Sequence, residues 1–159
     1  MAVFRKVALS GLMMAALICV SQVQAQVFPR GNGIAMTGVE QFDAYMNISQ
    51  WDEMEQEQQA FRSKAQQHFT TGLEEAGARR RSGTGNNLIC RIQAVRESNV
   101  VAYTARLEYW VMTEVGVNTL TWENGALGAV SADRFTEEMV ADECVKYFTD
   151  EWAKWNSVR

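Results

Sequence analysis

The chain has 159 residues, of which 47% are hydrophobic and 21% charged, and its formal net charge is −4. This length fits one domain of ordinary size with a single hydrophobic core. A net acidic chain is a poor ligand for nucleic acid and for anionic lipid, so neither is an expected partner.

The first 25 residues are typical of a secretory signal peptide. Arg5 and Lys6 give a positive start, the apolar stretch over residues 7–20 is too short to span a bilayer, and Ala25 ends a small-residue cleavage site. We expect cleavage after Ala25, no transmembrane anchor in the mature chain, and a periplasmic or secreted protein. Loss of two basic residues takes the formal charge from −4 to −6. The alternative is an uncleaved anchor helix.

Export would separate the three cysteines into one that is lost with the signal peptide and two that remain in the mature chain. Cys19 leaves with the signal peptide, and the isoleucine before it is not the small residue that precedes a lipidated cysteine, so a lipoprotein is not expected. Cys90 and Cys144 remain as an even pair in an oxidising compartment. We expect a disulfide between them, worth about 4 kcal/mol in the chain-entropy model. Two separately buried thiols are the alternative.

The first half of the mature chain predicts a tail, a strand and a helix. Residues 26–37 hold the only proline and are expected to form an irregular N-terminal tail before a single domain over residues 38–159. Alternation of apolar and polar residues over 38–48 predicts a half-buried strand. Ser49 is the expected N-cap of a helix over residues 51–76.

The second half predicts strands and then a helix. Strands are expected over residues 88–95, 100–112 and 115–122, followed by turn chemistry at 123–125 and a short piece at 127–130. A last helix is expected over residues 133–156, with Asp133 as its N-cap and Cys144 on its apolar stripe.

This order, β-α-β-β-β-α, predicts an α+β fold. Both helices have one apolar stripe and the strands have one apolar face, so we expect a two-layer sandwich: a mostly antiparallel sheet of four or five strands with both helices on one face. The element order and the signal peptide are similar in outline to small periplasmic α+β accessory domains, such as the amino-terminal domain of TolB and related envelope lipoproteins. That resemblance has no diagnostic residues and implies no site.

The sequence contains few residues of the types that catalytic sites use. His68 is the only histidine, so no triad or Cys-His pair can be built without it, and we interpret it as a helix residue. The acidic pairs are adjacent in sequence and diverge on a helix. We therefore expect no catalytic residues, no metal and no cofactor.

Two groups of residues are candidates for a binding surface. Trp110 falls on the sheet face opposite the helices, together with Arg106 and Glu108, and an exposed aromatic ring marks possible binding surfaces. Loops or the N-terminal tail covering this face are the alternative. The second group is the basic loop of Arg79, Arg80 and Arg81, for which a solvated loop is the alternative.

These observations favour a small non-enzymatic binding or accessory protein of the cell envelope, acting on another envelope protein. One alternative is a small-ligand carrier or a hydrolase-like enzyme with a cleft that gathers Tyr103, Tyr109 or Glu108. Another is a secreted inhibitor or effector, for which residues 77–87 are the candidate loop. The sequence does not indicate an oligomeric state or a partner's identity.

Overall fold

The computed structural model describes residues 28–49 and 55–156. The expected signal peptide and the expected first turn of the first helix lie outside these residues. In chain order the elements are β1 (Arg30–Gly31), η1 (Gly33–Met36), β2 (Gln41–Ser49), α1 (Glu55–Glu75), β3 (Arg79–Arg80), β4 (Asn86–Glu97), β5 (Val100–Met112), β6 (Asn118–Ser131), η2 (Ala132–Arg134) and α2 (Glu137–Asn156).

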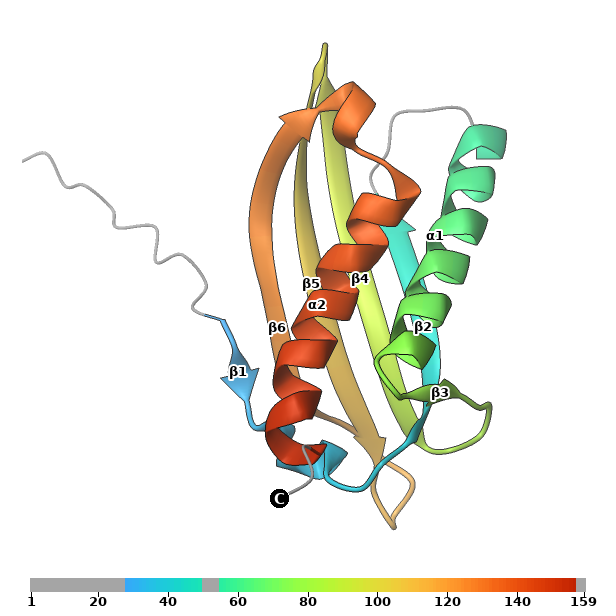
Figure 1. Ribbon diagram of the computed structural model, residues 1–159, viewed down its shortest axis with the longest axis vertical. Coiled ribbons are helices and arrows are strands. Elements are labelled where there is room, and N and C mark those ends of the chain that lie inside the picture. The colour runs from blue at the N-terminus through green and yellow to red at the C-terminus, as the bar shows by residue number, and fades with distance from the viewer. Residues whose placement is uncertain (1–27, 50–54, 157–159) are drawn as a thin grey trace, which may run out of the picture.

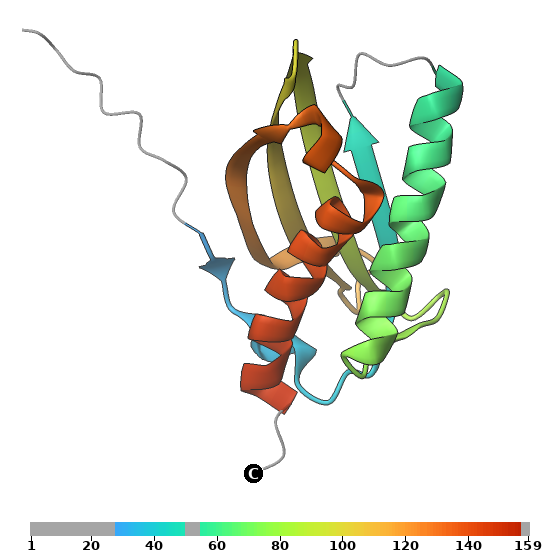
Figure 2. The same cartoon turned by 45° about the horizontal axis from the view of Figure 1, so that its top comes forward.

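The architecture is a two-layer α+β sandwich. One six-stranded mixed sheet has the strand order β1-β6-β5-β4-β2-β3, and both helices lie side by side on one of its faces (Figure 1 and Figure 2). The fold class expected from the sequence is confirmed. The sheet has more strands than expected because β1 and β3, of two residues each, add to its two edges.

Strand pairing follows from the length of the connections. β4, β5 and β6 form antiparallel pairs through short links, whereas β2 and β4 are parallel neighbours with α1 between them in sequence. A parallel pair needs a long crossover, and an amphipathic helix supplies one that also covers the sheet. The unit β2-α1-β4 therefore fixes where α1 lies.

The core fills the space between the sheet and the helices. Phe42 of β2 makes edge-on ring contacts with Tyr109 of β5 and with Phe148 of α2, each with a centroid distance of 5.6 Å. All three side chains are fully or almost fully buried. Aromatic pairs in this geometry are stabilising beyond the area they bury, and here they join both layers.

The predicted disulfide is confirmed. Cys90 of β4 and Cys144 of α2 are bonded, with their Cα atoms 6.0 Å apart, and both are fully buried. Alternation along β4 places Cys90 on the helix side between the equally buried Leu88 and Ile92. The bond therefore joins a central strand of the sheet to the helix packed on it.

The turn predicted at residues 123–125 is wrong, because these residues lie inside the single strand β6. Asn124 and Gly125 pair with Leu107 and Arg106 of β5, and one register irregularity occurs between Tyr109 and Trp110. A Cβ atom added at Gly125 would lie 2.5 Å from the carbonyl oxygen of Ala105. The glycine thus permits a close approach of two strands, and the Asn-Gly pair does not reverse the chain.

The predicted N-cap of the last helix is also wrong. Asp133 belongs to the short 3-10 helix η2, and α2 begins four residues later at Glu137. Thr136 caps α2, because its hydroxyl accepts a hydrogen bond of 3.2 Å from the backbone N–H of Met139. Threonine supplies the same capping chemistry as aspartate, here from the residue directly before the helix.

Part of the segment expected to be an irregular tail is ordered. Arg30 and Gly31 pair with Glu123 and Trp122 of β6, and Met36 in η1 is fully buried. A tail packs in this way when its apolar side chain and its backbone both find partners. The pairing depends on β6, which is distant in sequence.

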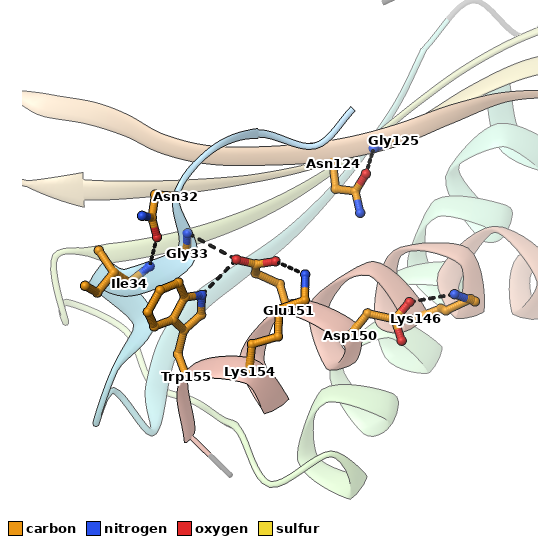
Figure 3. Close-up of polar contacts among 10 residues, drawn as sticks. All are labelled: Asn32, Gly33, Ile34, Asn124, Gly125, Lys146, Asp150, Glu151, Lys154 and Trp155. Atoms are coloured by element: carbon orange, nitrogen blue, oxygen red, sulfur yellow. Dashed lines mark hydrogen bonds and ion pairs between the residues drawn. The ribbon is translucent and has the colours of Figure 1, made fainter. Parts of the chain in front are cut away.

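Glu151 of α2 holds this segment in place. Its carboxylate is buried and accepts hydrogen bonds from the Gly33 backbone N–H at 3.2 Å and from the Trp155 indole at 2.8 Å, while Lys154 Nζ lies 2.6 Å away (Figure 3). Burial by itself would raise the pKa of Glu151, but hydrogen bonds from Lys154 and Trp155 outweigh it and lower the pKa. A Cβ at position 33 would lie 2.4 Å from Glu151 Oε1, so any residue larger than glycine there would force the Glu151 side chain to move.

Replacing both bonded cysteines by alanine is expected to lower the free energy of unfolding by about 4 kcal/mol, because the unfolded chain regains the entropy of a long loop. Denaturant unfolding followed by circular dichroism measures this. Reduction of the wild-type protein should give a similar loss. An unchanged midpoint in both experiments contradicts a stabilising bond.

Glu151→Gln is expected to lower the stability by about 1–2 kcal/mol at pH 7, since a charged acceptor of three partners becomes neutral. Because the pKa is lowered in the folded state, the carboxylate stabilises the fold above its unfolded pKa, and this contribution is lost as pH falls through the folded pKa. The difference between wild type and variant should shrink below about pH 4. Unfolding curves across the range from about pH 3 to about pH 7 measure it. A difference that stays constant with pH contradicts the role of the charge.

Candidate functional site

The second face of the sheet carries the candidate surface. In both views the helices lie on one side of the strands, and no helix of the described residues covers the other side (Figure 1 and Figure 2). We call this the outer face. Because strand residues alternate between faces, Arg106, Glu108 and Trp110 of β5 all lie on it, while Leu107 and Tyr109 between them are fully buried against the helices.

Charged side chains from four strands meet on the outer face. We call them the outer-face cluster; its members are Arg30, Arg91, Arg106, Glu108 and Glu123. The strand register sets Glu108 directly opposite Glu123, and Arg91 directly opposite Arg106. Like charges directly opposite destabilise a sheet. Each of these side chains must therefore find opposite charge on another neighbour.

Ion pairs with diagonal neighbours, with a neighbour on the same strand and with the edge strand β1 join the five side chains in one continuous chain. Glu108 lies 2.9 Å from Arg91 Nε and 2.8 Å from Arg106 Nη2. Arg106 also approaches Glu123, with Nε 3.8 Å from Oε2, and Arg30 Nη1 lies 3.1 Å from Oε1 of the same carboxylate. Arg106 thus bridges two carboxylates that would otherwise repel each other.

The two carboxylates are covered although they lie on an open face. The side chains of Glu108 and Glu123 are 4% and 7% exposed, whereas those of Arg91 and Arg106 are 36% and 39% exposed. The arginines lie over the acids, so this part of the surface presents guanidinium groups to solvent. Arginine is enriched where interfaces form because its planar fork binds carboxylates and stacks on rings.

Trp110 is attached to the same cluster. Its indole N–H donates a hydrogen bond of 2.9 Å to Glu108 Oε2, and the side chain is half-buried. The ring is held in one orientation, which lowers the entropy that a partner must remove. Exposed apolar side chains occur on the same face; they are Tyr45, Val95, Met112, Leu120 and Leu127.

The predicted basic loop does not join this cluster. Arg79 and Arg80 form β3 at the far edge of the sheet, beyond β4 and β2, and Arg81 donates to Gln41 Oε1 at 2.9 Å. The turn that follows is anchored, because the buried carboxylate of Asp43 accepts hydrogen bonds from the backbone of Gly83 and Thr84. Most of residues 77–87 are therefore paired or anchored, unlike the protruding loop of an inhibitor.

The cleft expected of a small-ligand carrier or enzyme is not assembled. Tyr103 and Tyr109 lie on the helix side of β5, whereas Glu108 lies on the outer face, so the three cannot line one cavity. The Tyr109 hydroxyl donates to the Ala35 carbonyl oxygen at 3.3 Å, and burial raises its pKa to about 12. A buried, hydrogen-bonded tyrosine with a raised pKa contributes to the packing of the core.

Three members of the outer-face cluster escaped the sequence analysis for different reasons. Arg91 alternates with the buried Cys90 and Ile92, so its face was readable from the pattern. Glu123 was assigned to a turn, and Arg30 to an irregular tail. Their places depend on the pairing of β6 with β5 and of β1 with β6, which only the tertiary structure decides.

Two further features were sought in the residues that the structure describes, a metal-binding group and a membrane-spanning helix. Residues 28–49 and 55–156 hold no group of three or more histidine, cysteine or acidic side chains placed to bind a metal. Neither α1 nor α2, over their described lengths, is apolar enough to serve as a membrane span.

Comparisons with known proteins find a limited structural similarity and no match in sequence. No protein-family model matches the chain, and no curated protein matches it. Among solved structures, it is similar to a PelC dodecamer from Paraburkholderia phytofirmans, with 9% sequence identity and a TM-score of 0.46 over 77% of this chain and 92% of that one. Nothing about ligands or assembly follows for this chain from a likeness at this level.

Glu108→Gln is expected to lower the free energy of unfolding by about 2–4 kcal/mol, because two arginines and one indole lose a buried charged acceptor. Partial exposure of the arginines screens part of the effect. Glu97→Gln, at the exposed end of β4, is the matched control and should change stability by less than about 0.5 kcal/mol. Equal effects of the two substitutions in denaturant unfolding contradict the central place of Glu108.

Proposed function

We propose that this protein is an exported binding or accessory protein of the cell envelope, and that it acts on another envelope protein through the outer face of its sheet. The observation that carries the proposal is the pairing of Trp110 with the outer-face cluster on a face that no helix of the described residues covers. Tryptophan and arginine are the residues that most often dominate binding energy at interfaces.

The disulfide supports the location. A fully buried bond between Cys90 and Cys144 forms and persists in an oxidising compartment, and is rare in the cytosol. The expected signal peptide over residues 1–25 and cleavage after Ala25 belong to the same proposal.

Site-specific photo-crosslinking in cells that naturally make the protein tests the binding surface. A photoreactive residue at Leu127, 79% exposed on the outer face, should capture a discrete partner. The same residue at Thr149, exposed on α2, is the matched control and should not. Trp110→Ala should reduce the Leu127 adduct by at least about tenfold, the effect of losing roughly 1.4 kcal/mol of binding energy.

A conservative variant separates binding from folding. Trp110→Phe keeps an aromatic ring and loses the hydrogen bond to Glu108, so it should retain most of the adduct. Equal adducts at Leu127 and Thr149, or an adduct that Trp110→Ala leaves unchanged, contradict the proposed surface. Fractionation of the same cells tests the location, and recovery of the protein with the cytoplasmic fraction contradicts export.

A further inference from the structure

The strand β6 forms a long margin of the sheet that is covered at only one place. The short strand β1 pairs with β6 at Trp122 and Glu123, and residues 28 and 29 before β1 do not continue this pairing. Over residues 124–131, β6 pairs with β5 on one side and with no strand of the described residues on the other. In both views this part of β6 lies at the edge of the sheet (Figure 1 and Figure 2).

Every second residue of this free edge directs its backbone out of the sheet. The carbonyl oxygen of Thr121 accepts the Asn32 N–H at 3.0 Å, so it faces away from β5. Alternate residues of a strand direct their N–H and C=O groups to the same side. Gly125 agrees with this direction, because its N–H is bonded to the side chain of the preceding asparagine at 2.9 Å (Figure 3). The backbone groups of Leu127 and Ala129 therefore point outward.

The usual protections of an edge strand are missing over residues 124–131. Natural edges are protected by charged side chains, proline or bulges. This segment, NGALGAVS, holds no charged residue and no proline, and the one irregularity in the pairing of β5 with β6 lies before it. Leu127 is 79% exposed, and Ala126 and Ala129 are exposed as well. An open, uncharged edge of this length is a template for pairing with another chain.

This edge is complementary to a second copy of itself. In an antiparallel pair with a two-fold axis at Gly128, Leu127 of each copy lies opposite Ala129 of the other. Both residues direct their backbone outward, so they form a hydrogen-bonded pair. A large side chain then meets a small one on the outer face, twice by symmetry. Because the segment has no charge, the two copies do not repel each other.

The ends of the edge fit the same register. Residues 125–131 of the two copies pair over their whole length. Trp122 and Glu123, which β1 covers, fall opposite residues 134 and 133 of the other copy, where the chain has left the sheet for η2. The β1 strand of one copy therefore lies beyond the end of β6 of the other, and the two do not compete for one position. A charged segment of another protein would find no ion-pair partner along this edge.

We propose that two copies of this chain pair through residues 125–131 of β6 and form a homodimer with one continuous sheet. The two-fold axis is perpendicular to the sheet, so the helices of both copies lie on the same side and the outer faces form one surface. Trp110 lies on β5, one strand away from the pairing, and is not covered by it. The inference therefore does not depend on the role of Trp110.

Sedimentation velocity of the disulfide-bonded protein over a range of concentrations tests the dimer. The wild type should show a reversible equilibrium of monomer and dimer. Leu127→Pro removes an outward N–H that makes no bond to β5, so the monomer should keep its circular dichroism spectrum. Leu127→Ala loses the same side chain, keeps the N–H and is the matched control. Because symmetry removes two hydrogen bonds, the proline variant should dimerise at least about tenfold more weakly than the alanine variant.

Charged variants test the register. Leu127→Lys should weaken the dimer at least about tenfold, because it brings two lysines close to the axis. Adding Ala129→Glu to the same chain places a glutamate opposite each lysine and should recover at least about tenfold of the affinity. Val115→Lys makes the same change as Leu127→Lys at a side chain that is 84% exposed in the loop between β5 and β6, and should have no effect.

The proposal is wrong if the wild type stays monomeric up to about 1 mM, if the proline and alanine variants dimerise equally, or if the added glutamate recovers nothing. A closed assembly of more than two copies also overturns it. Trp110→Ala should leave the dimer unchanged. In the crosslinking experiment an adduct of two copies is recognised by its mass, twice that of the chain, so this dimer is distinguishable from a partner on the outer face.

Discussion

The bond between Cys90 and Cys144 is the constraint on which the places of α2 and of the segment before β2 depend. It attaches α2 to β4, the strand that pairs in parallel with β2 and antiparallel with β5. Once α2 is held there, its Glu151 binds the backbone of Gly33 and orders the segment before β2. That segment includes β1, whose Arg30 completes the ion pairs of Glu123 on the opposite face. The disulfide in the core thus affects the ion pairs of the outer face through α2, which holds the segment that carries Arg30.

Because both helices pack on one face of the sheet, the outer face must be stabilised by contacts among its own side chains. It does so with arginines that lie over buried carboxylates, and the cost of each desolvated acid is offset by two guanidinium groups. Removing an arginine would leave a covered acid partly unpaired and would disturb folding as well as binding. Trp110 is different, because its ring adds contact area while Glu108 keeps both arginines. A substitution of Trp110 is therefore the change most suited to test binding without a large effect on stability.

The layers, the helix faces and the disulfide can be predicted from the amino-acid sequence, because these depend on local periodicity and on the chemistry of two cysteines. The sequence also places Trp110, Arg106 and Glu108 on one face, since alternation within β5 is a local property. The continuity of β6 through Asn124 and Gly125 could not be predicted in this way, because the same Asn-Gly pair suits a turn or a close approach of strands. Only the tertiary structure shows that Arg30 and Glu123 join the cluster, since pairing between distant strands leaves no signal in either strand's own sequence.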